Sequence, residues 1–75
     1  MNDIGLFNEG RLVHEGQQVD DENNIEFPGC LIIDTWAGMW AWHVTDKVLY
    51  EIVDDKLVKA QSPWREKNDW SVRRL

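Results

Sequence analysis

Turn-forming residues divide this sequence into short apolar runs, and their spacing favours a small antiparallel sheet. Residues 8–10 separate the runs 4–7 and 11–14, and Gly10 can adopt the positive φ that a tight hairpin turn requires. A second unit of the same form has the acidic turn Asp54-Asp55-Lys56 at its centre. We therefore predict a mainly β fold of consecutive hairpins, arranged as a meander or a partial barrel.

The stretch from Cys30 to Thr45 predicts the central hairpin. If Gly38 and Met39 form a two-residue turn, residues pair so that their numbers sum to 77. Asp34 is then directly opposite His43, on a mixed face. The other face is almost wholly apolar and should belong to the core; it carries Leu31, Ile33, Ala37, Trp40, Trp42 and Val44.

Three other segments complete the expected domain, which spans residues 1–75. The polar stretch 15–24 predicts an exposed acidic loop. Residues 46–60 have apolar positions at helical spacing, but their β-branched residues and the Asp54-Asp55 break favour a hairpin. Ser62-Pro63 is a typical helix start, so we expect at most one short helix near residues 63–68.

Charge is distributed unevenly along the chain. Residues 1–46 contain nine acids and one base, for a net charge of −8, whereas residues 47–75 have a net charge of +2. No lysine or arginine occurs between Leu12 and Asp46. Such a field repels nucleic acids and anionic membranes. We therefore expect a basic protein partner, with no direct DNA binding and no membrane contact.

Cys30 is the only cysteine, so the chain can form no internal disulfide, and a lone thiol is typical of a reducing compartment. The first residues have neither the basic nor the apolar region of a secretory signal. No apolar run approaches the roughly 18 residues of a membrane span. We expect a cytoplasmic protein, in the host cytoplasm if a phage encodes it.

Five tryptophans are unusual in a chain of 75 residues. A small domain buries only some of them, and a half-exposed tryptophan is the commonest interface hot spot. We expect Trp36 to anchor an interface that is otherwise acidic. The expected interface residues are Glu15, Asp20, Asp21, Glu22, Glu26, Asp34 and Trp36.

No set of residues predicts catalysis. Asp34 and His43 form the best dyad, but cross-strand pairs of this kind are usually structural. Cys30 lies four residues from Asp34 along the strand, about 13 Å, and is therefore predicted to be too far from His43 to act as its nucleophile. His14, Cys30, His43 and Asp46 lack the spacing of a metal site. We expect a non-enzymatic protein without a metal or cofactor.

In size and charge the chain is similar to the small acidic inhibitors of phages and mobile elements, which include anti-CRISPR proteins, DNA mimics and immunity proteins. That likeness implies an inhibitor that occludes a basic surface of a host nucleic-acid-processing protein. Two alternatives remain. One is a nucleotide binder or sponge that uses Trp64, Trp70, Arg73 and Arg74. The other is an oligomeric structural subunit, and a homodimer is compatible with either.

Overall fold

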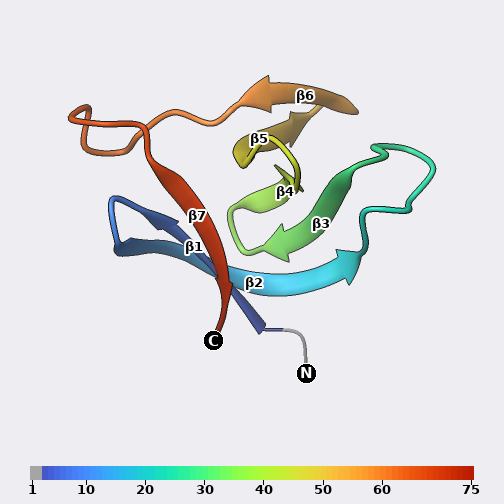
Figure 1. Ribbon diagram of the computed structural model, residues 1–75, viewed down its shortest axis with the longest axis horizontal. Helices are drawn as coiled ribbons and strands as arrows, with labels where there is room; N and C mark the ends of the chain where they lie inside the picture. The colour runs from blue at the N-terminus through green and yellow to red at the C-terminus, as the bar shows by residue number, and fades with distance from the viewer. Residues whose placement is uncertain (1–2) are drawn as a thin grey trace.

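The computed structural model describes residues 3–75, which form one antiparallel sheet of seven strands (Figure 1). The strands lie in the order β6-β5-β4-β3-β2-β1-β7, so consecutive strands are neighbours except that the last one crosses to pair with the first. The predicted fold of hairpins is confirmed. The strands are β1 (Asp3–Asn8), β2 (Arg11–Asp20), β3 (Cys30–Thr35), β4 (Gly38–His43), β5 (Val48–Val53), β6 (Lys56–Lys59) and β7 (Trp70–Arg74).

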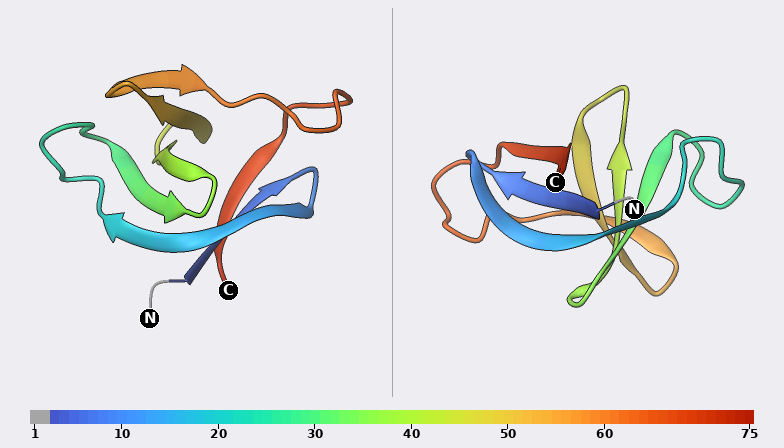
Figure 2. Two further views of the ribbon diagram at one scale, coloured as in Figure 1. Left: turned by 180° about the vertical axis from the view of Figure 1, so that it is seen from behind. Right: turned by 90° about the horizontal axis from the view of Figure 1, so that it is seen from below.

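The sheet curls into an open, partial barrel, so that β7 approaches β5 as well as pairing with β1 (Figures 1 and 2). Directly after β6, the backbone N–H of Ala60 donates to the carbonyl of Leu49 at 3.0 Å and carries the chain across the open side. Residues 63–66 form a turn and a bend, residues 67–69 have no regular structure, and the described part of the chain contains no helix. The inner face encloses the main core: Ile4, Leu6, Ile33, Trp40, Trp42, Leu49, Ala60 and Trp70.

Two hairpins use the turn type that matches the right-handed twist of paired strands. Glu9 and Gly10 connect β1 to β2 with φ values of 52° and 79°, and Asp54 and Asp55 connect β5 to β6 with 51° and 61°. Two successive positive φ values define a type I′ turn. Residues 46–60 therefore contain a hairpin, as predicted, although each turn has two residues rather than three.

The predicted register of the central hairpin is wrong. Thr35 pairs with Gly38, so Trp36 and Ala37 form the turn in place of Gly38 and Met39. The Thr35 hydroxyl donates to the Gly38 carbonyl at 2.9 Å and accepts from the Ala37 N–H at 3.1 Å, which stabilises this turn. Each β3 residue consequently meets a partner four positions earlier than predicted. Four is an even shift, so the predicted apolar face still points into the core.

The extent of the predicted acidic loop also requires correction. β2 continues to Asp20, and the loop spans residues 21–29 instead of 15–24. β2 lies between β1 and β3, so the polar residues 15–18 have paired backbones, and their polarity does not indicate a loop. A bulge between Gln18 and Asp20 leaves Val19 unpaired at the end of the strand.

A second apolar cluster lies on the outer face of β3 and β4. Cys30, Ile32 and Ala41 are buried there. Four half-buried side chains pack against them: Phe27, Met39, Tyr50 and Ile52. Phe27 comes from the 21–29 loop, which therefore folds over part of the outer face. These strands are apolar on both sides, which explains why their sequences read as nearly continuous apolar runs.

Candidate functional site

The buried side chain of Asn24 organises the 21–29 loop. Its amide nitrogen donates to the carbonyls of Asp21 at 2.8 Å, Phe27 at 3.0 Å and Cys30 at 2.8 Å. Its amide oxygen accepts from the backbone N–H of Phe27 at 2.6 Å. Because two amide hydrogens serve three carbonyls, one of them is shared. A single side chain thus fixes both ends and the middle of the loop.

Acidic side chains and Gly29 complete the loop. The Asp20 carboxylate accepts from the Asp21 N–H, and the Asp21 carboxylate accepts from the Asn23 N–H, both at 2.9 Å. Gly29 has a φ of 89°, and its N–H donates to the Glu22 carbonyl at 2.8 Å. A Cβ at Gly29 would lie 3.3 Å from Nε2 of His43, so the loop closes tightly against the end of β4. Asp20 and Asp21 are therefore structural as well as acidic.

Turning Asn24 inward leaves the next residue pointing outward. Ile25 is 99% exposed and stands at one wall of a shallow groove of about 570 Å³. Val19, which the bulge leaves unpaired, also lines the groove and is 54% exposed. Ile32 and Met39 line the groove between them, together with Asp20 and Glu26. Apolar and acidic side chains therefore line the groove together.

All seven of the predicted interface residues are exposed, but they do not form one cluster. Asp20 and Glu26 line the groove, and Asp34 pairs with Met39 beside it. Asp21 and Glu22 lie on the same loop. Glu15 and Trp36 instead share a separate hollow with Leu12, Val13 and His14.

Trp36 occupies the β3–β4 turn and is 86% exposed. The His14 ring meets it edge-on, with ring centroids 5.7 Å apart. The same His14 ring contacts Trp40 in the core, at 5.4 Å between centroids. His14 therefore supports the exposed indole from inside the barrel.

The predicted Asp34–His43 dyad is absent, because the register places Met39 opposite Asp34 and Cys30 opposite His43. The predicted separation of Cys30 from His43 is wrong for the same reason. The nearest carboxylate to His43 is that of Asp46, 3.5 Å from Nδ1, and the same Nδ1 accepts from the Asp46 N–H at 3.2 Å. Cys30 is 1% exposed, and burial raises the pKa of its thiol, which disfavours the thiolate that a nucleophile requires.

We expect the Cys30 thiol to react with iodoacetamide only when the protein opens. Its burial beneath the 21–29 loop should slow alkylation at least about 100-fold relative to the urea-unfolded chain. Mass spectrometry of a timed labelling series measures both rates. Labelling of the folded protein at the rate of the unfolded chain would show that the outer cluster is open.

The alternative ligand residues do not converge on one pocket. Trp70 is buried in the core, with its ring centroid 6.2 Å from that of Trp40. Trp64 is half-buried under the guanidinium of Arg11, which lies 4.9 Å from the ring centroid. Arg73 stacks on Phe7 at 3.9 Å. Alternation along β7 places Arg73 and the exposed Arg74 on opposite faces.

A comparison of the chain with protein-family models, with curated proteins and with solved structures finds no match in any of the three. Within residues 3–75, no three histidine, cysteine, aspartate or glutamate side chains are grouped so that they could hold a metal ion. The same part of the chain has no helix with the length and apolarity needed to cross a membrane.

Proposed function

We propose that this protein is a non-enzymatic binding module that covers a basic surface of a partner protein. Its acidic side chains support this function because basic side chains of the same chain do not neutralise them. Within residues 3–75 no lysine or arginine pairs with a carboxylate, and the one imidazole–carboxylate contact joins His43 to Asp46. The exposed carboxylates of Glu15 and Glu22 therefore keep their full attraction for an external cation.

The rigidity of the loop also supports a binding role. Asn24 holds the loop in one conformation before any partner arrives, so little conformational entropy is lost on binding. Trp36 adds an exposed aromatic surface that His14 orients from below. A preformed acidic surface with an aromatic anchor suits a stoichiometric inhibitor of a nucleic-acid-processing protein, whose substrate site is basic.

Replacing both Glu15 and Glu22 with lysine is expected to slow association with a basic partner about tenfold or more at low salt. Neither carboxylate makes a hydrogen bond within residues 3–75, so the melting temperature should hardly change. Asp20 and Asp21 are unsuitable for this test because their carboxylates bind loop N–H groups. A partner captured from lysate and identified by mass spectrometry is then measured kinetically at two salt concentrations.

The matched control replaces Glu66 and Asp69 with lysine. This variant has the same change in net charge, but both residues are exposed in the segment between β6 and β7. It should bind nearly as fast as the wild type. An association rate that responds neither to salt nor to the Glu15 and Glu22 substitutions would overturn the acidic interface.

A further inference from the structure

The outer face of the sheet carries an apolar belt that joins an acidic end to a basic end. Cross-strand pairing gives one unbroken row across five strands: Lys59, Tyr50, Ala41, Ile32 and Asp20. The neighbouring cross-strand pairs show the same arrangement. Leu57 pairs with Ile52 at the β6 side, and Asp34 pairs with Met39 at the β3 side. The belt therefore ends in a lysine at β6 and in aspartates at β2 and β3.

Several apolar side chains of this belt are open to solvent. Ile25 and Val19 line the groove at the acidic end, while Leu57 is 38% exposed at the basic end. Half-buried Tyr50, Ile52 and Met39 lie between these ends. The Asn24 hydrogen bonds hold Ile25 outward, so the loop cannot relieve its exposure by folding inward. Covering a fully exposed isoleucine favours a complex, because it removes apolar surface from water.

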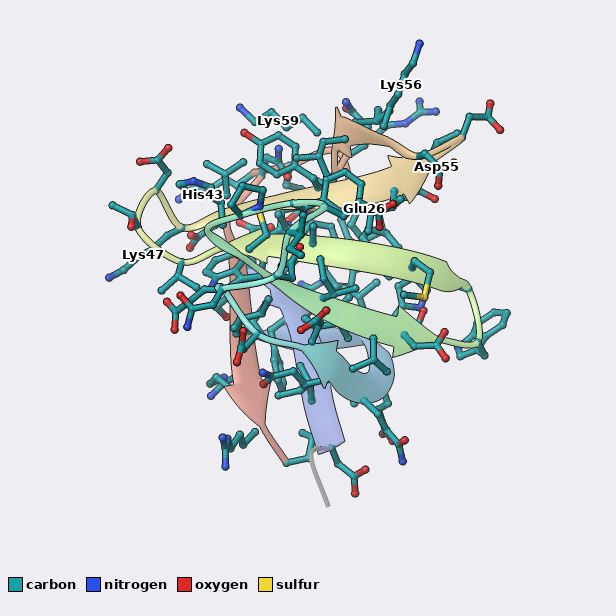
Figure 3. The ribbon with its side chains drawn as sticks, turned by 90° about the vertical axis from the view of Figure 1, so that its right-hand side faces the viewer. Glu26, His43, Lys47, Asp55, Lys56 and Lys59 are labelled. Atoms are coloured by element: carbon teal, nitrogen blue, oxygen red, sulfur yellow. The ribbon has the colours of Figure 1, made fainter. Side chains whose placement is uncertain are left out.

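The charges at the two ends of the belt are opposite. Figure 3 faces the belt, with Glu26 on the loop in front of the sheet and Lys59 along the β6 side. Asp20, Glu26 and Asp34 belong to the other end. A two-fold axis through the middle of the belt brings the acidic end of one copy onto the basic end of another. The patch is therefore complementary to itself in both charge and apolarity.

We infer that the outer face is the interface of a symmetric homodimer. Ile25 and Glu26 of one copy lie against Leu57 and Lys59 of the second copy, and the two-fold axis repeats the contact. A standard interface buries about 800 Å² per partner, roughly one-sixth of the 5103 Å² surface of the chain. Glu15 and Trp36 line a separate hollow outside the groove, and the dimer leaves that hollow accessible for the proposed partner.

Sedimentation velocity of the purified protein over a concentration series tests this interface. The wild type should form a concentration-dependent dimer, and Ile25→Ser or Leu57→Ser should each weaken it at least tenfold. Both side chains are exposed in the single chain, so folding should be preserved, and circular dichroism checks this. Val58→Ser is the matched control, because Val58 is 47% exposed in the same strand but alternates to the inner side.

A charge exchange tests the proposed orientation of the two copies. Glu26→Lys and Lys59→Glu should each weaken the dimer, and the double variant should recover at least half of the lost affinity. A protein that stays monomeric throughout the series would overturn the inference while leaving the proposed function intact. Dimers that are equally sensitive to Val58→Ser, or unaffected by the charge exchange, would overturn it in favour of pairing through the β6 edge.

Discussion

Asn24→Ala is expected to lower the free energy of unfolding by about 3 kcal/mol, because it removes the partner of one buried carbonyl, two part-buried carbonyls and one part-buried N–H. The wild-type amide makes four hydrogen bonds, at 2.6 to 3.0 Å, to backbone groups of the 21–29 loop and of Cys30 at the start of β3. Loss of the loop would also uncover the second apolar cluster beneath Phe27. Urea denaturation followed by circular dichroism measures the change.

Two further substitutions in this loop test whether the loss of stability comes from the hydrogen bonds of the Asn24 amide rather than from the removal of any polar side chain there. Asn23→Ala removes an exposed amide next in sequence and should change stability by less than about 0.5 kcal/mol. Asn24→Asp should be at least as damaging as alanine, because a carboxylate oxygen replaces the donor that faces three carbonyls. A fully stable Asn24→Ala protein would show that the loop needs no such support.

Much of the fold could be predicted because the turn residues and the alternation of side chains along the strands determine it locally. Gly10 and the Asp54-Asp55 pair supply positive φ values where the two tight hairpins need them. Trp40 and Trp42 face the core in both the predicted and the observed register, since a four-residue slip preserves the alternation. The exact pairing was missed because Thr35 stabilises its turn through side-chain hydrogen bonds, whereas glycine position alone favoured a later turn.

The candidate site was only partly predictable. Acidity identified exposed positions correctly, since charged side chains of a loop rarely become buried. It gave no sign that Asn24 is buried and organises the loop, because Asn23 and Asn24 are identical in sequence and only the three-dimensional position of carbonyls distinguishes them. The apolar belt could not be predicted from the sequence either. It brings together residues from five strands through pairings that depend on the corrected register.

Trp40→Ala is expected to have the largest effect on stability, a loss of about 3–5 kcal/mol, which would unfold most of a domain this small. Trp40 is 7% exposed, and its ring contacts both His14 and Trp70 across the inner face. Its indole N–H also donates to the Thr35 hydroxyl at 3.1 Å, which links the core to the turn of the central hairpin. Alanine would remove these contacts together and leave a cavity between β2, β4 and β7.

Graded substitutions distinguish the parts of this effect. Trp40→Phe keeps most of the buried ring and should lose about 1–2 kcal/mol through the smaller volume and the missing N–H. Trp36→Ala, at the exposed turn, should cost less than about 1 kcal/mol because its indole is 86% exposed. Urea denaturation followed by circular dichroism ranks the three variants. A cooperatively folded Trp40→Ala protein with a midpoint near that of Trp36→Ala would contradict the central position of Trp40, because an 86% exposed side chain cannot hold the core as a 7% exposed one does.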